Sequence, residues 1–341
     1  MKNSQTSSIR PEKPLLRLYL TLFLITLASA CLSLMLGPVS LSPVEVVSAL
    51  FKADAVTTAD RIALYARLPR TCGCIVAGAA LAVSGAIIQG VLSNPLAAPN
   101  VIGVNSGAGL AAAICCAFFP GAYALVPFAA FFGALLSVLL VLLIAERTGA
   151  SKITLVLGGV AISSVLSAGV DAVVTFVPDA LVGYSDFRIG SLSGLTMSKL
   201  SPAAWVVLAA LALAFSLTHE LDLLMLGRDT ARSLGLRAGK MRILLLAVAA
   251  ALAGAAVSFA GLLGFIGLIV PHIMRRLVGD ESRLLLPGCA MGGAVMLLLC
   301  DLLSRMLFQP YELPVGIALS FIGGPFFVWL LLRQRKGRRH D

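Results

Sequence analysis

Three arginines are the side chains whose type and spacing most suggest recognition chemistry. Arg67 and Arg70 flank Leu68-Pro69 just before a long apolar run, and Arg305 follows another such run. Because proline is favoured in the first turn of a helix, Pro69 predicts a helix start. Two cations would then lie at the positive end of the helix dipole, where cations are disfavoured. An external anion would offset that cost through bidentate guanidinium–carboxylate contacts; anchoring at a lipid–water interface is the alternative.

Patterns typical of catalysis or metal binding are absent from the sequence. The seven cysteines include no Cys-x-x-Cys pair, and the three histidines are not spaced to complete a zinc site. The segment Gly235–Met241 imitates a phosphate-binding loop but is one residue short between its glycines, with methionine where a hydroxyl must bind magnesium. We therefore expect no catalytic residue, metal or cofactor in this chain; ATP and magnesium, if used, would be bound by another subunit.

The composition indicates which elements must position these arginines. The chain has 341 residues, of which 59% are hydrophobic and 12% charged, and its mean hydropathy is +0.99. Soluble domains contain about 25% charged residues, so a soluble enzyme is excluded, as is a disordered chain. We predict an all-α polytopic membrane protein with ten spans: Leu16–Leu36, Cys72–Leu92, Val101–Phe119, Ala122–Ile144, Ile153–Val177, Pro202–Leu217, Ile243–Ala260, Leu262–Leu277, Leu284–Leu303 and Leu313–Leu332.

The seventh and eighth spans have the least certain boundary, since Ile243–Leu277 is one apolar run of 35 residues. As a single helix it would be about 52 Å long, whereas the hydrocarbon core of a bilayer is about 30 Å thick. The run must therefore fold back, and we expect the turn at Gly261, Gly264 and Gly267. Asp171 is the only ionisable residue well inside a span, where it could act in a relay, cap a helix or face water.

The basic residues predict the orientation. With both termini cytoplasmic, 19 of the 26 lysines and arginines fall on the inner side, as the positive-inside tendency requires. The net charge of +10 is thus mainly a topology signal, and nucleic-acid binding is not expected. We divide the chain into a cytoplasmic tail (1–14), a permease domain (15–333) and a second cytoplasmic tail (334–341).

Two polar segments interrupt the spans. The inner loop 219–242 is too polar to cross a bilayer, and its glycine breaks predict two short helices on the inner surface. This basic loop could bind anionic lipid or dock a cytoplasmic partner. The outer segment Asp179–Ser201, which contains Arg188, is expected to form a short re-entrant helix over the outer mouth.

Several long motifs, in order, closely resemble the FecCD/BtuC-like permease family, whose members import iron-siderophores, haem and cobalamin. The resemblance covers nearly the whole chain, from about residue 15 to residue 333. The motifs that carry it are Arg67-Leu-Pro-Arg70, Gly78-Ala-Ala-Leu-Ala-Val-Ser-Gly85-Ala-Ile-Ile-Gln89, Asn94-Pro95 through Gly103, Leu226 to Gly235, Gly264 through Pro271-His272 to Arg276, and Glu312-Leu-Pro314-Val-Gly316 through Gly324-Pro325.

This resemblance implies a type II ABC importer in a bacterial cytoplasmic membrane. Members have ten helices per subunit and pair around a central path; a homodimer is expected here. They also bind two ATPase subunits inside and receive substrate from an extracytoplasmic binding protein. By position, Arg67, Arg70 and Arg305 correspond to the docking arginines. The ATPase-coupling residues would be Gly227, Arg228, Asp229, Ala231, Arg232, Leu234 and Gly235; the cytoplasmic gate would include Ser151 and Thr154; and Ser163, Ser164 and Ser167 would line the path.

The carried substance and the driving force remain open at this point. An iron-siderophore complex is the first expectation, with haem and cobalamin as alternatives. Relatives often have tryptophan before the Gly-Ser-Leu motif, whereas this chain has Phe187-Arg188-Ile189-Gly190, so Arg188 either contacts an anionic substrate in the path or faces solvent. A carrier driven by an ion gradient is the competing class.

Overall fold

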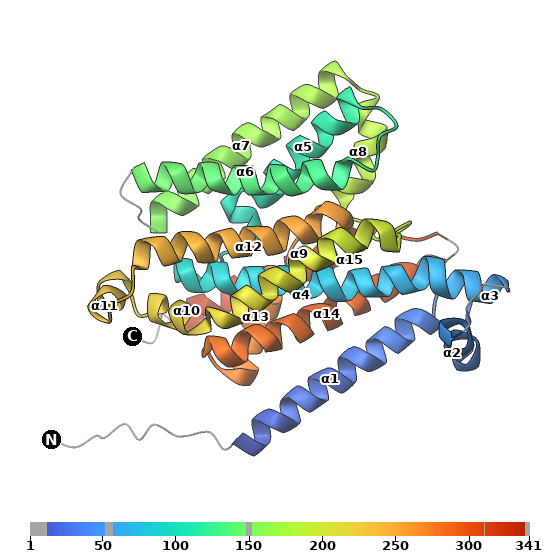
Figure 1. Cartoon of the computed structure of the whole chain (residues 1–341), viewed down its shortest axis with the longest axis horizontal. Helices are drawn as coiled ribbons and strands as arrows, with labels where there is room; N and C mark the ends of the chain where they lie inside the picture. Colours follow the sequence, from blue (N-terminus) through green and yellow to red (C-terminus); the bar gives the residue numbers. More distant parts are fainter. Residues whose placement is uncertain (1–11, 52–56, 148–151, 310, 338–341) are drawn as a thin grey trace.

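The computed structural model describes residues 12–51, 57–147, 152–309 and 311–337. These residues form helices joined by turns, with no strand among them (Figure 1). The fold class is therefore all-α, as predicted. The helices are α1 (Glu12–Met35), α2 (Pro43–Phe51), α3 (Thr58–Arg61), a π-helix (Ile62–Arg67), α4 (Leu68–Leu92), a 3-10 helix (Pro99–Ile102), α5 (Val104–Phe118), α6 (Val126–Arg147), α7 (Lys152–Phe176), α8 (Ala180–Ile189), α9 (Met197–Ser216), α10 (Thr218–Met225), α11 (Arg228–Ser233), α12 (Ala238–Ala260), α13 (Ile266–Val278), α14 (Ser282–Met306) and α15 (Val315–Gly337).

Each of the ten predicted apolar runs corresponds to a helix, but the helices differ in length. Within the described part of the chain, seven are long and apolar enough to cross a membrane. α5 and α15 supply shorter apolar stretches. α13 has only 13 residues, about 20 Å of helix, which is less than the thickness of a bilayer core. The protein is therefore a multi-pass membrane protein, while the number of complete crossings is not fixed at ten.

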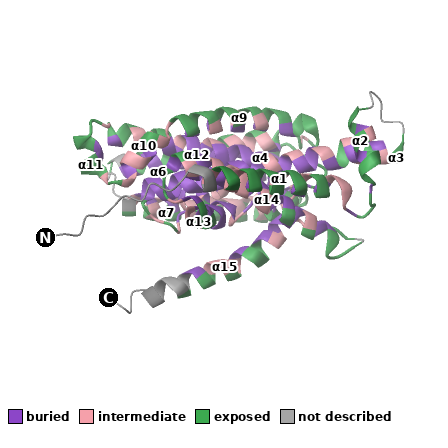
Figure 2. Ribbon diagram, turned by 90° about the horizontal axis from the view of Figure 1, so that it is seen from below, coloured by how far each residue is buried: buried purple, intermediate pink, exposed green. Residues whose placement is uncertain are grey.

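Helix α4 forms the centre of the bundle, and α7 lies at its edge. In the helical segment that contains α4, 89% of the most apolar stretch is buried inside the molecule. In α7 the corresponding buried share is 11%. Helices α12, α13 and α14 pack around α4, and Figure 2 shows α15 extending away from this body. Small residues permit the tight packing: a Cβ on Gly85 would lie 1.9 Å from the carbonyl oxygen of Gly267 in α13. α7 and α15 thus present apolar surface that the single chain does not cover.

The predicted break in the 35-residue apolar run is confirmed at Gly261 and Gly264, whereas Gly267, the third glycine expected in the turn, lies inside α13. α12 ends at Ala260, and Gly261 has a φ of +73°, a conformation that side chains with a Cβ rarely adopt. Phe265, which precedes α13, also has a positive φ of 66°, and this the sequence did not indicate. The Leu262 amide donates to the Phe187 carbonyl oxygen at 2.9 Å, so the break is fastened to the end of α8.

Pro69 lies in the first turn of α4, as predicted, but it does not begin the helical segment. A single helical segment runs from Thr58 to Leu92, and its actual start is a capping box in which Thr57 and Asp60 exchange side-chain and backbone hydrogen bonds. Pro69 instead lies at the junction between the π-helix and α4. Arg67 and Arg70 are consequently about ten residues inside a helix, and the dipole argument for an external anion does not hold.

The bundle has two ends, which lie at the left and right of Figure 1. The end with α10 and α11 is called the α11 end below, and the end with α2, α3 and α8 is called the α8 end. Two short helices in the inner loop and one short helix after α7 were predicted, and α10, α11 and α8 confirm them. Gly227 and Gly235, with φ of +106° and +86°, bracket α11.

Candidate functional site

Arg67, Arg70 and Arg305 come together at the α8 end, from two helices that are far apart in the sequence. Their exposed fractions are 5%, 8% and 3%. All three are therefore buried, and none forms part of an open basic surface in this conformation. Together with Asp301 and Glu312 they are called the arginine cluster.

Asp301 in α14 is the centre of the arginine cluster. Its carboxylate is fully buried and accepts from Arg70 Nε at 2.9 Å and 3.1 Å. Arg305 Nε lies 3.1 Å from the other side of the same carboxylate, one helical turn away. The Arg70 Nη1 also donates to Glu312 at 2.6 Å. Two carboxylates thus face three guanidinium groups, and the cluster keeps one net positive charge.

Arg67 and the outer nitrogens of Arg305 bind the end of α1. Arg67 Nη1 donates to the carbonyl oxygens of Leu34 and Met35 at 2.8 Å and 2.7 Å, and Nη2 donates to Val39. Arg305 Nη2 donates to the Ser33 hydroxyl at 2.9 Å. The last carbonyl groups of a helix have no partners within the helix, and cations at that end are favourable. These two arginines therefore cap α1 and attach it to the bundle.

A cavity of about 460 Å³ opens beside the arginine cluster. It lies between the ends of α4, α6, α8, α9 and α12 and the segment before α15. Its charged lining residues are Arg70, Asp186, Lys199 and Glu312. Arg67, Asp301 and Arg305 are not among its lining residues, so Arg70 is the member of the three arginines that reaches this space, which is called the outer cavity below.

Arg188 lies on a separate groove of about 460 Å³ between α8 and α15, lined by Ile189, Leu262, Ile317, Ser320 and Phe321. Its side chain is exposed. Backbone contacts hold α8 here, because the Gly316 amide donates to the Gly190 carbonyl oxygen at 3.0 Å. A Cβ on Gly316 would lie 1.9 Å from the Ile189 carbonyl oxygen. Arg188 is thus an exposed cation on a helix end whose backbone is attached to the start of α15, and most of the other residues lining the groove are apolar.

The three serines predicted to line a path do not share one environment. Ser164 and Ser167 are exposed on α7, as is Asp171. The Ser163 hydroxyl is buried and has no hydrogen-bond partner among the described residues. It faces the packing side of α7, where a Cβ on Gly103 would approach it to 3.7 Å. Only two of the three therefore lie on the free face of the helix.

The α11 end presents the predicted coupling residues. Arg228, Asp229, Arg232, Leu234 and Gly235 are exposed, whereas Ala231 is fully buried and Gly227 is partly buried. Leu234 is 58% exposed. α11 therefore has one residue packed inward and a mixed charged and apolar outer face.

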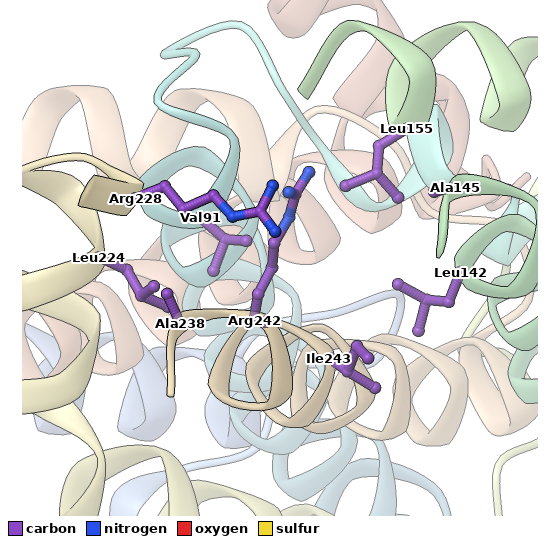
Figure 3. Close-up of a pocket in the computed structure, with 10 residues that line it drawn as sticks. Val91, Leu142, Ala145, Leu155, Leu224, Arg228, Ala238, Arg242 and Ile243 are labelled. Atoms are coloured by element: carbon purple, nitrogen blue, oxygen red, sulfur yellow. The ribbon is translucent and has the colours of Figure 1, made fainter. Parts of the chain in front are cut away.

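A small cavity of about 70 Å³ lies between α11, the end of α6 and the start of α7. Arg228 and Arg242 project into it side by side (Figure 3). Ala145 at the end of α6 and Leu155 at the start of α7 line the opposite side. Thr154, one of the two predicted gate residues, is next to Leu155 and half-buried; Ser151, the other, lies outside the described residues.

Sequence reasoning missed the partners of the three arginines. Asp301 precedes Arg305 by four residues on one helix, a spacing that could have indicated the ion pair. Nothing local connects Arg70 with Asp301, 231 residues later. A second missed contact joins Gln89 of α4 to Arg275 of α13. Among the described residues no cluster of His, Cys, Asp and Glu is arranged to hold a metal ion.

Comparison with known proteins decides the family. The family model of the FecCD transport family matches residues 25–333. This chain belongs to the FecCD transport family. The match begins within α1 and ends within α15, so the family region contains both ends of the bundle. The sequence-based assignment to this family is thus confirmed.

The chain is similar to the Fe(3+)-citrate import system permease protein YfmE of Bacillus subtilis (strain 168), with 38% identity covering 94% of this chain and 96% of that protein. It is 40% identical to the hemin transport system permease protein HmuU of Yersinia pestis, over 81% of this chain and 84% of that protein. A metal-chelate type ABC transporter solved in an inward-facing conformation matches with a TM-score of 0.81 and 29% identity, covering 93% and 99% of the two chains.

Proposed function

We propose that this protein is the transmembrane permease subunit of an ATP-binding-cassette importer that carries an iron-siderophore complex across a bacterial cytoplasmic membrane. The observation that carries the proposal is the FecCD match over residues 25–333, which includes both the α11 loop and the arginine cluster. In this proposal the α11 end and both termini are cytoplasmic, since the basic loops gather there. The α8 end faces the extracytoplasmic side.

The geometry of the α11 end supports coupling to separate ATPase subunits. Arg228 of α11 shares a cavity with Ala145 of α6 and Leu155 of α7, so a displacement of α11 would press on the start of α7, which carries the proposed gate residue Thr154. Two ATPase subunits holding α11 differently before and after ATP hydrolysis would thereby open one end of the path and close the other. Only such a difference in contacts between two states can shift their populations.

A second permease subunit is proposed to cover α7 and α15. Most of the α7 surface is exposed in the single chain, including Ser164, Ser167 and Asp171. Polar residues at membrane depth usually face a partner or a water-filled space. Two copies facing each other across these helices would enclose a path with Arg188 at its outer mouth; the remaining apolar surface would contact membrane lipid.

The decisive experiment separates ATP-driven import from a carrier driven by an ion gradient. The chain is reconstituted in liposomes with its ATPase subunits, substrate-binding protein and the ferric chelate that this protein carries, with ATP but no proton or sodium gradient. We expect uptake that stops when the ATPase is omitted. Uptake by this chain alone, driven by an imposed ion gradient, would contradict the proposal.

Charge reversal on α11 should release the ATPase. We expect the Arg228→Glu, Arg232→Glu double variant to lose at least about tenfold in affinity for the ATPase subunits, because each charge-assisted contact contributes about 1.5–3 kcal/mol. Both side chains are exposed, so the fold should persist. Co-purification of the ATPase measures the effect, and Lys199→Glu, at the opposite end, is the control. Normal stoichiometry in the double variant would contradict the coupling role.

Arg188 is proposed to favour chelates with carboxylate groups. Iron-citrate and hemin, named for the two relatives above, both carry such groups. We expect Arg188→Gln to reduce ATP-driven import of an anionic ferric chelate about three- to tenfold, since a charge-assisted contact is lost. Import of a neutral ferric trihydroxamate, where it is carried at all, should stay within about twofold. Equal effects on both chelates would show that Arg188 only faces solvent.

A further inference from the structure

The arginine cluster contains two kinds of arginine, which differ in what their outer nitrogens bind. Arg67 and Arg305 donate to carbonyl groups at the end of α1. Those carbonyls belong to the backbone of the same chain and cannot leave without unfastening α1. Among the residues that the structure describes, Arg70 makes no such contact. Its partners are two carboxylates, and it is the arginine that lines the outer cavity.

The two carboxylates bound to Arg70 differ in depth. Asp301 is fully buried and holds the inner Nε. The Glu312 side chain is 32% exposed and touches Nη1 from the side of the outer cavity. Glu312 lies in the segment between α14 and α15 rather than in a helix. A partly exposed ion pair contributes less than a buried one, because water competes for both groups. Asp301 is thus the permanent partner of Arg70, and Glu312 the exchangeable one.

We propose that Glu312 occupies, in the undocked permease, the position that a carboxylate of the extracytoplasmic binding protein takes on docking. This inference rests on the proposed function and refines it. Of the three arginines expected to dock, Arg70 is the one that exchanges carboxylates, while Arg67 and Arg305 act as structural caps of α1. The partner contributes an aspartate or glutamate on a loop that enters the outer cavity and displaces Glu312.

Displacement of Glu312 would also change the structure at the outer mouth of the proposed path. Glu312 is followed directly by Leu313, whose amide donates to the Ser304 carbonyl oxygen at 3.1 Å, and by the start of α15 at Val315. Gly316 is hydrogen-bonded to Gly190 beyond α8. Release of Glu312 therefore frees a segment that is attached to both helices bordering the Arg188 groove, so docking and access to that groove are linked.

The first test measures whether Glu312 shields Arg70. The full chain in lipid nanodiscs is treated with phenylglyoxal, and modification of each arginine is followed by peptide mass spectrometry. Glu312→Gln should accelerate the modification of Arg70 by about three- to tenfold, the range expected for loss of one partly exposed, hydrogen-bonded ion pair. Arg67 and Arg305 should stay protected. Asp186→Asn is the matched control, because it removes a charge from the same cavity without contacting Arg70. Unchanged modification of Arg70 would overturn the proposal.

The second test measures docking of the binding protein of the same importer to nanodiscs. Removing the internal competitor should tighten docking of Glu312→Gln about three- to tenfold, whereas Arg70→Gln should weaken it by at least as much. Asp179→Asn, which removes an exposed carboxylate at the same end of the bundle but outside the lining of the outer cavity, should match the wild type. If the wild type docks and imports with ATP but Glu312→Gln docks equally or more weakly, the exchange is wrong and the proposed function stands. A wild type that neither docks nor imports would overturn both.

Discussion

Replacing Asp301 with asparagine is expected to be among the most damaging single substitutions in this protein. The substitution keeps the shape of the side chain but removes the only fully buried carboxylate of the arginine cluster. Arg70 and Arg305 would then remain buried with one negative charge fewer between them. Breaking a buried ion pair from one side costs about 3–5 kcal/mol, since the remaining charge is left uncompensated. We therefore expect the α8 end to open, with α1 detaching from α14.

Thermal unfolding of the purified chain in detergent measures this effect. The quantity compared is the temperature at which half of the monodisperse protein is lost. Asp186→Asn removes an exposed carboxylate from the neighbouring cavity and should leave the midpoint nearly unchanged. Combining Asp301→Asn with Arg305→Met should recover part of the loss, because it removes one of the stranded charges. A single Asp301→Asn variant as stable as the wild type would contradict the assignment of Asp301 as the centre of the cluster.

The arginine cluster also shows which contacts could not be predicted from the sequence. Arg67 and Arg70 were recognisable from the sequence through the Arg67-Leu-Pro-Arg70 motif of the family, although the dipole argument that also singled them out does not hold. Their partners were not recognisable, because Asp301 lies 231 residues from Arg70 and the carbonyl groups of α1 carry no side-chain signature. The proline between the two arginines misled the helix assignment, since the π-helix upstream of Pro69 has no clear sequence signal.

The helices themselves were largely predictable, because the requirement to satisfy backbone groups in lipid makes each long apolar run a helix. The breaks at Gly227, Gly235 and Gly261 were also predictable, since all three adopt a positive φ that favours glycine. The shortness of α13 was not, because nothing in Leu262–Leu277 distinguishes a complete span from a partial one. Phe265 adopts a glycine-like φ of 66°, and a Cβ on Gly323 would come within 2.1 Å of its ring, a contact between distant segments.

Replacing either of two adjacent glycines in α7 with alanine is expected to have opposite effects on stability. A Cβ on Gly159 would lie 2.0 Å from the Val101 carbonyl oxygen in the 3-10 helix, whereas a Cβ on Gly158 would have no neighbour within 4 Å. Gly159→Ala must push α7 away from the segment Pro99–Ile102, and such overpacking typically costs about 1–3 kcal/mol. Gly158→Ala should be neutral or stabilising by up to about 1 kcal/mol, because alanine is the better helix former.

The two variants are compared as single chains in detergent, so that contacts of α7 with a second subunit do not enter the stability measurement. We expect the unfolding midpoint of Gly159→Ala to fall clearly below that of Gly158→Ala. Because α7 begins next to the proposed gate residue Thr154, Gly159→Ala should also lower ATP-driven uptake in the reconstituted importer. Equal unfolding midpoints for the two variants would mean that α7 does not pack against the 3-10 helix at Val101. The proposal that this contact positions the gate residue Thr154 would then be wrong.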